Sequence, residues 1–142
     1  MFDLAGLGVT RKRRFLSSSG DEVTADSAER TEHAYTLPKS TEIQATFSRE
    51  GLGNKLRKIF KREVQTGDGL FDEAVNIKTD TAETTAALLE SRDLRAVIER
   101  LIANGGALEI DGAIVKVDLP GRQELDAEVE MLLVTTLVSP AS

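Results

Sequence analysis

The sequence feature that most constrains the fold is an amphipathic helix that leads directly into a tight hairpin. The apolar residues of one segment recur at intervals of three and four, which places them on one face of a helix: Leu94, Val97, Ile98, Leu101 and Ile102. Gly105 follows and suits a left-handed helix cap. The segments LEI and AIVKVDL then flank Asp111-Gly112, a pair that favours a type I′ turn because both central residues need positive φ. A helix joined to an antiparallel hairpin indicates the α+β class.

The rest of the chain alternates between strand-like and helix-like patterns. We expect a half-buried strand over residues 42–49, a basic amphipathic helix over Leu52–Arg62, a second strand over residues 73–79, a helix starting at Asp80 or Thr81, and a last helix over Leu125–Leu137. Together these predict a small mixed or antiparallel sheet that includes the C-terminal hairpin and packs against three to four helices.

Few apolar residues occur between positions 17 and 34, so this stretch offers little for a core. We interpret residues 1–33 as a mobile N-terminal arm and polar linker, residues 34–138 as a single α+β domain, and residues 139–142 as a tail. His33 stands at the linker boundary, where a lone histidine is expected to be solvated.

Composition excludes several kinds of chemistry. The chain has no cysteine and one histidine, which rules out disulfides, thiolate metal sites, cysteine nucleophiles and sites with several histidines. A net charge of −6 and the lack of tryptophan argue against nucleic acid as a partner. The longest apolar run, Met131–Val138, is far shorter than the ~20 residues that cross a bilayer. With no secretory signal pattern, we expect a cytoplasmic protein without a cofactor.

Two clusters of basic residues are the candidate contact surface. One is the predicted basic helix and the other is the arm, so the candidate residues are Lys55, Arg57, Lys58, Lys61 and Arg62 together with Arg11, Lys12, Arg13 and Arg14. We predict a non-catalytic binding or scaffolding module that contacts an acidic protein or an anionic membrane surface. A solvated helix face and a disordered start are the simpler alternatives. Self-association through the last helix is a further possibility, although packing against the hairpin is favoured there.

Asp68 and Asp72 are the candidates for an alternative function. They stand four residues apart around a glycine turn, so their carboxylates could bind a divalent cation or share a proton. That would make the protein a small metal-dependent enzyme or a metal-binding protein. Such aspartates more commonly hydrogen-bond to their own turn backbone, and we therefore assign neither catalytic residues nor metal ligands.

The order of elements from Tyr35 to Leu119, with Gly67-Asp68-x-x-Phe71-Asp72 as its distinctive core, resembles a family of uncharacterised bacterial proteins. Many members of that family are anchored in a membrane by helices outside this module. The resemblance implies the order of the fold and a bacterial origin. It implies no activity and no catalytic residues.

Overall fold

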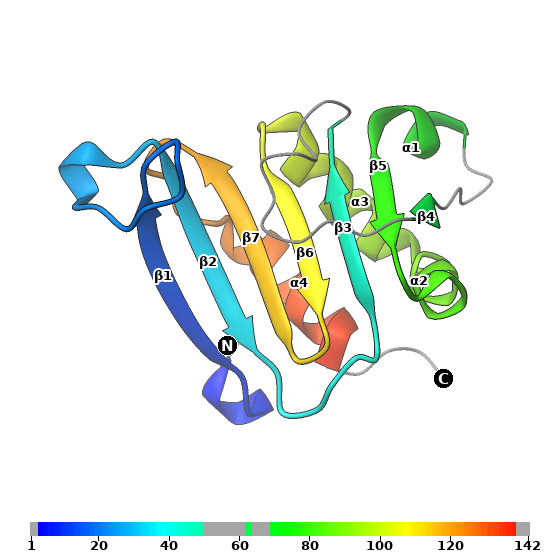
Figure 1. Cartoon of the computed structure of the whole chain (residues 1–142). Coiled ribbons are helices and arrows are strands. Elements are labelled where there is room, and N and C mark those ends of the chain that lie inside the picture. Colours follow the sequence, from blue (N-terminus) through cyan, green and yellow to red (C-terminus); the bar gives the residue numbers. More distant parts are fainter. Residues whose placement is uncertain (1–2, 50–61, 64–68, 139–142) are drawn as a thin grey trace.

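The strands that the structure describes form one antiparallel sheet (Figure 1). The computed structural model describes residues 3–49, 62–63 and 69–138. Its strands are β1 (Thr10–Leu16), β2 (Arg30–Thr36), β3 (Gln44–Ser48), β4 (Arg62–Glu63), β5 (Asn76–Thr79), β6 (Ala107–Asp111) and β7 (Ile114–Pro120). They lie side by side in the order β1-β2-β7-β6-β3-β5-β4. β1 is therefore at one edge, and β2 lies between β1 and the hairpin.

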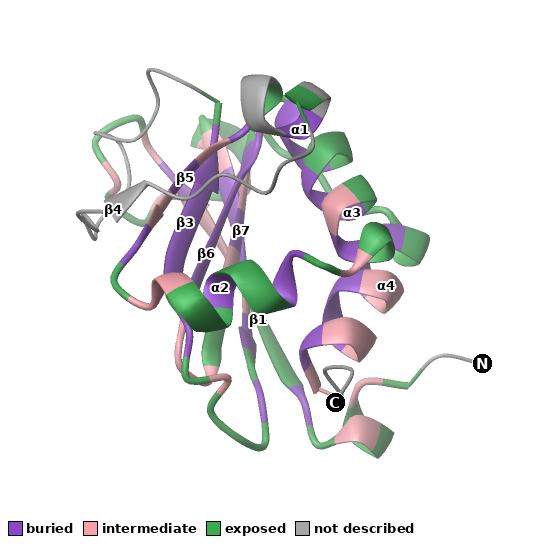
Figure 2. Ribbon diagram, turned by 90° about the vertical axis from the view of Figure 1, so that its right-hand side faces the viewer, coloured by how far each residue is buried: buried purple, intermediate pink, exposed green. Residues whose placement is uncertain are grey.

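Helices cover one face of this sheet, which confirms the α+β class. They are α1 (Gly69–Ala74), α2 (Ala82–Leu88), α3 (Arg92–Ala103) and α4 (Ala127–Val138), with short 3₁₀ turns at Ala5–Leu7 and Ala25–Ser27. Figure 2 shows α3 and α4 along one side of the sheet. No helix in the described ranges is long and apolar enough to cross a bilayer.

The helix and hairpin predicted around residues 94–119 are confirmed. Ser91 caps α3 by accepting a hydrogen bond from the Leu94 backbone N–H at 3.2 Å, and all five predicted apolar positions of α3 are buried. The turn itself differs by one residue from the prediction. Asp111 pairs with Ile114, so the two central residues are Gly112 and Ala113, and only Gly112 has positive φ (63°). A two-residue turn with positive φ only at its first central position needs just one glycine, and Gly112 supplies it.

The predicted strand over residues 42–49 and the predicted last helix are also confirmed, as β3 and α4. The expectation that this strand is half-buried is wrong, because Thr46 and Ser48 on its second face are only 3 % and 2 % exposed. On α4, Leu133 and Leu137 are buried in the core, which agrees with packing inward rather than with a self-association face. The segment 73–79 is only partly a strand, because α1 continues to Ala74 and β5 begins at Asn76.

The expectation that residues 1–33 lie outside the domain is wrong for the described residues. β1 pairs with β2 along seven residues, and β2 pairs with β7 along another seven, so both strands belong to the sheet. The prediction failed because the buried face of β2 is polar: Thr31, His33 and Tyr35 are each at most 1 % exposed. Each side chain has a hydrogen-bond partner elsewhere in the fold, which offsets the cost of burying it.

Candidate interaction surface along strand β1

Strand β1 is the seven-residue edge of the sheet, and its backbone leaves hydrogen-bonding groups pointing outward. The Phe15 carbonyl accepts from the Val23 N–H on the side away from β2, whereas the Leu16 carbonyl accepts from the Glu29 N–H on the β2 side. Backbone direction alternates along a strand, so the N–H and C=O groups of Arg11 and Arg13 also face away from β2.

The end of β1 near Leu16 is partly covered by the chain that follows it. The Ser17 backbone N–H donates to the Asp21 carbonyl at 2.8 Å, and an isolated antiparallel β-bridge joins Leu16 to Glu22. No backbone hydrogen bond reaches the outward groups of Arg11 or Arg13 from any residue that the structure describes. The open part of the edge is therefore the first two thirds of β1, visible at the side of the sheet opposite β4 in Figure 1.

Most of the basic side chains of β1 are paired with carboxylates of the same molecule. Arg11 Nη1 lies 2.8 Å from Glu130 Oε2, and Arg14 Nη2 lies 2.7 Å from Glu32 Oε1. Arg13 forms an ion pair with Glu124 and its guanidinium lies 5.1 Å from the centre of the Phe15 ring. Lys12 has no ion pair with any described residue, so it is the unmatched cation of the strand.

These ion pairs correct the expectation that Arg11, Lys12, Arg13 and Arg14 are all free to contact a partner. Three of its four cations have internal partners, so the surface does not offer four uncompensated charges. The side chains of Arg11 and Arg13 nevertheless remain 46 % and 43 % exposed, and a half-exposed ion pair can be shared with an incoming carboxylate. The surface thus combines an open backbone edge with moderate positive charge.

A polar triad of Tyr35, Glu130 and Arg11 ties β1 and β2 to α4. The Tyr35 hydroxyl donates to Glu130 Oε2 at 2.6 Å, and Arg11 donates to the same oxygen. Burial, followed by the carboxylate of Glu130, raises the pKa of Tyr35 above its usual value. The triad holds together elements that are 95 residues apart, and it positions the edge strand against the helix layer.

His33 is a second buried group on this side of the sheet. Its Nε2 lies 3.0 Å from the Gln123 carbonyl, which requires that nitrogen to carry the proton and donate. Its Nδ1 is buried and has no hydrogen-bond partner among the described residues. Burial lowers the pKa of His33, with smaller contributions in the same direction from Arg11 and Arg13. The imidazole is therefore neutral at pH 7, and the expectation of a solvated histidine is wrong.

The other candidate residues fall mainly outside the described ranges. This is true of Lys55, Arg57, Lys58, Lys61 and Asp68, and of the side chains of Arg62 and Asp72. The Arg62 backbone belongs to β4 rather than to the predicted helix, and Asp72 lies within α1. In the described part of the chain, no cluster of three or more histidines or acidic residues could hold a metal ion. The metal hypothesis stays a prediction.

Sequence reasoning missed strand β2 and the carboxylates that pair with β1, above all Glu130. The alternation of Thr31, His33 and Tyr35, which is typical of a strand with one buried face, could have revealed β2. Comparisons of this chain with family models, curated proteins and solved structures found no match. The resemblance to the bacterial family with the Gly-Asp-x-x-Phe-Asp core therefore stays a prediction.

Proposed function

We propose that the protein is a non-catalytic binding module that takes up an extended acidic segment of another protein along the open edge of β1. The single observation that carries this proposal is the outward-facing backbone of Arg11 and Arg13, which has no partner within the described residues. An extended peptide can add to such an edge as a further strand, with main-chain hydrogen bonds supplying the affinity.

The charge of β1 supports an acidic partner. A strand that pairs with β1 brings its side chains within about 5 Å of Arg11, Lys12 and Arg13, where carboxylates are favourable and cations are not. The same charge disfavours pairing between two copies of β1, because arginine and lysine would then face one another across the new interface.

The experiment uses the full chain and a synthetic octapeptide of alternating glutamate and valine. We expect saturable binding that shifts the backbone amide signals of Arg11, Arg13 and Phe15 in NMR spectra. Binding should weaken as salt is raised, because the screening length falls from about 10 Å at 0.1 M to about 3 Å at 1 M. An octapeptide of alternating lysine and valine should bind far more weakly.

The matched variants are Arg13→Pro and Arg13→Gln. Both remove the same charge, but only proline removes the outward N–H, and it does so without breaking a bond to β2. We expect Arg13→Pro to abolish peptide binding and Arg13→Gln to retain most of it. Equal affinity of the two variants would contradict strand addition. Binding to vesicles of anionic lipid that Arg13→Pro leaves unchanged, with no peptide binding, would favour a membrane surface instead.

A further inference from the structure

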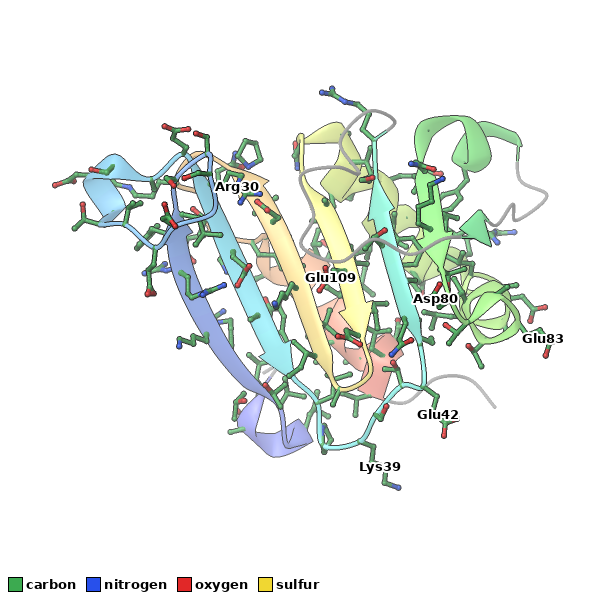
Figure 3. All side chains as sticks on the ribbon, in the orientation of Figure 1. Arg30, Lys39, Glu42, Asp80, Glu83 and Glu109 are labelled. Atoms are coloured by element: carbon green, nitrogen blue, oxygen red, sulfur yellow. The ribbon has the colours of Figure 1, made fainter. Side chains whose placement is uncertain are left out.

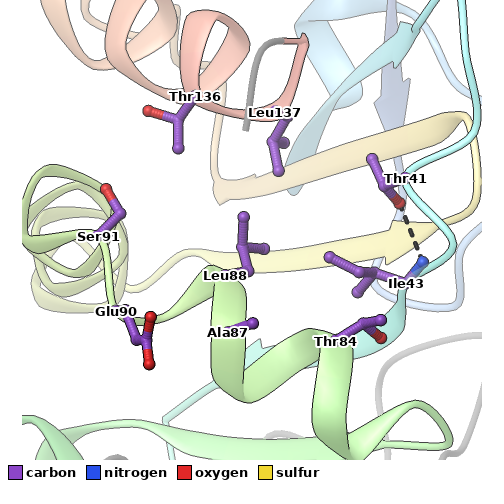
Figure 4. A pocket seen from close by; sticks show the side chains of 9 residues that line it. All are labelled: Thr41, Ile43, Thr84, Ala87, Leu88, Glu90, Ser91, Thr136 and Leu137. Atoms are coloured by element: carbon purple, nitrogen blue, oxygen red, sulfur yellow. Dashed lines mark hydrogen bonds between the residues drawn. The ribbon is translucent and has the colours of Figure 1, made fainter. Parts of the chain in front are cut away.

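A cavity of about 350 Å³ lies among the helices, away from β1 (Figure 4). Three of its sides are formed by α2, by Glu90 and Ser91 in the turn between α2 and α3, and by the end of α4. The segment before β3 closes the fourth side with Thr41 and Ile43. Its volume falls in the range of small-molecule sites in proteins.

The walls of this cavity are largely apolar. Ile43, Leu88 and Leu137 line it, and each of them is at most 8 % exposed, so they belong to the core as well as to the cavity. Figure 4 shows Leu88 and Ile43 pointing into the space, with Leu137 facing them from α4. An apolar body of matching size would bury surface here without displacing any charged group.

Two hydroxyl groups of the lining are available to a ligand. The Thr136 hydroxyl makes no hydrogen bond with any described residue, whereas the hydroxyl of its neighbour Thr135 donates to the Met131 carbonyl at 2.6 Å. The Ser91 oxygen accepts from the Leu94 N–H, which leaves its own O–H free to donate. The cavity therefore offers polar groups beside its apolar walls.

The charged groups at the rim are all acidic. Glu90 lines the cavity, and Glu42 and Glu83 line a second hollow that shares Thr84 with it. None of the three carboxylates forms an ion pair within the described ranges, and no lysine or arginine lines either hollow. Figure 3 shows Glu42 and Glu83 pointing outward near α2. Carboxylates without an ion pair attract a cation to this rim and repel an anion. Arg95 reduces this effect at Glu90, because its guanidinium donates to the adjacent Leu89 carbonyl at 2.8 Å.

We propose that this cavity binds a small amphipathic cation, an apolar chain or ring that carries one ammonium group. The apolar body lies between Ile43, Leu88 and Leu137, and the ammonium group lies at the rim beside Glu90. At the roughly 30 Å³ that one water molecule occupies in the liquid, a cavity of about 350 Å³ has room for about twelve groups of that size, enough for a ten-carbon chain with its ammonium group. This site is separate from β1 and does not depend on the function proposed for that strand.

Three probes of equal chain length test the chemical class: decylammonium, decanol and decanoate, each used with the full chain and below its micelle concentration. Calorimetry should show one decylammonium bound per chain, weaker binding of decanol and the weakest binding of decanoate. Equal affinity for all three, or tighter binding of decanoate, would overturn the assignment of a cation. Uptake of many molecules without saturation would overturn the site itself.

Substitutions at the rim test the role of the carboxylate. Glu90→Gln should weaken decylammonium binding about two- to fivefold, the range of an exposed ion pair, and should leave decanol binding unchanged. Glu99 is an exposed glutamate of α3 outside the lining, so Glu99→Gln is the charge-matched control and should have no effect. A loss of the same size in both variants would mean that general electrostatics, not this rim, attracts the probe.

A steric pair of variants locates the site. Ala87 and Ala86 are neighbouring exposed residues of α2, but only Ala87 lines the cavity. Ala87→Trp should reduce decylammonium affinity at least tenfold by filling the space, and Ala86→Trp should preserve it. Since both residues are exposed, both variants should fold, which circular dichroism verifies. Unchanged binding in Ala87→Trp would refute the proposed location.

Discussion

The hydrogen bond between Tyr35 and Glu130 gives the most direct test of how the N-terminal strands are held in the fold. The Tyr35→Phe substitution removes only the hydroxyl group and preserves a ring that is fully buried. The lost bond is short, 2.6 Å, and its acceptor is a carboxylate. Hydrogen bonds to charged groups contribute about 1.5–3 kcal/mol, so the free energy of unfolding should fall by that amount.

Arg11→Gln provides the internal comparison. It removes the second partner of the same Glu130 oxygen, but the Arg11 side chain is 46 % exposed, so water replaces much of what is lost. We expect a decrease of at most about 1 kcal/mol in the free energy of unfolding. Chemical denaturation monitored by circular dichroism measures the free energy of unfolding of both variants. The dependence of that free energy on denaturant concentration should be unchanged.

A double-mutant cycle isolates the bond from other effects of the substitutions. Tyr35→Phe and Glu130→Ala are combined, because alanine at position 130 offers no acceptor to the Tyr35 hydroxyl. The coupling energy should be at least about 1 kcal/mol because the two groups are in direct contact. A Tyr35→Phe variant within about 0.5 kcal/mol of the parent would refute the importance of the triad, as would a larger loss in Arg11→Gln.

Three further predictions concern single groups. Gly106→Ala should lower the free energy of unfolding by about 1–3 kcal/mol, measured by denaturation, because a Cβ there would lie 2.9 Å from the Asp118 carbonyl oxygen and 3.0 Å from the Leu101 carbonyl oxygen. His33 has a folded-state pKa below 6.5, so its contribution to stability is complete above pH 6.5 and is lost as the pH falls below that value. The slope is at most about 1.4 kcal/mol per pH unit, and His33→Gln should remove this dependence from the melting temperature just below pH 6.5. Tyr35 is the single tyrosine of the chain, and its pKa is raised above 10.0, so the ultraviolet absorbance of phenolate should appear only when the protein unfolds at alkaline pH. A normal titration near pH 10 would contradict the burial of the Tyr35 hydroxyl beside Glu130.

The elements that could be predicted from the sequence are those whose pattern is local. The apolar positions of α3 repeat with helical spacing, and apolar and polar residues alternate along the sequence of β3, although both of its faces are buried. Gly112 supplies the positive φ of the hairpin within the turn itself. In each case the residues that decide the structure are close together in the chain, so no knowledge of distant partners was needed.

The candidate surface could be predicted only in part. The four basic residues of β1 stood out as a cluster, but their pattern resembles that of a disordered arm. The acceptors Glu124 and Glu130 are more than a hundred residues away from the arginines that they pair with. Which cations remain available to a partner is therefore invisible in the local sequence. The cavity could not be predicted for the same reason, because its lining comes from segments that the chain brings together only on folding.

The sequence by itself determined the α+β class, helix α3 and the β6–β7 hairpin, because hydrophobic periodicity and turn chemistry act over a few neighbouring residues. Only the tertiary structure decided that the N-terminal segment joins the sheet. Burying Thr31, His33 and Tyr35 is favourable only when Gly121, Gln123 and Glu130 satisfy them, and those partners approach only when the whole chain has folded.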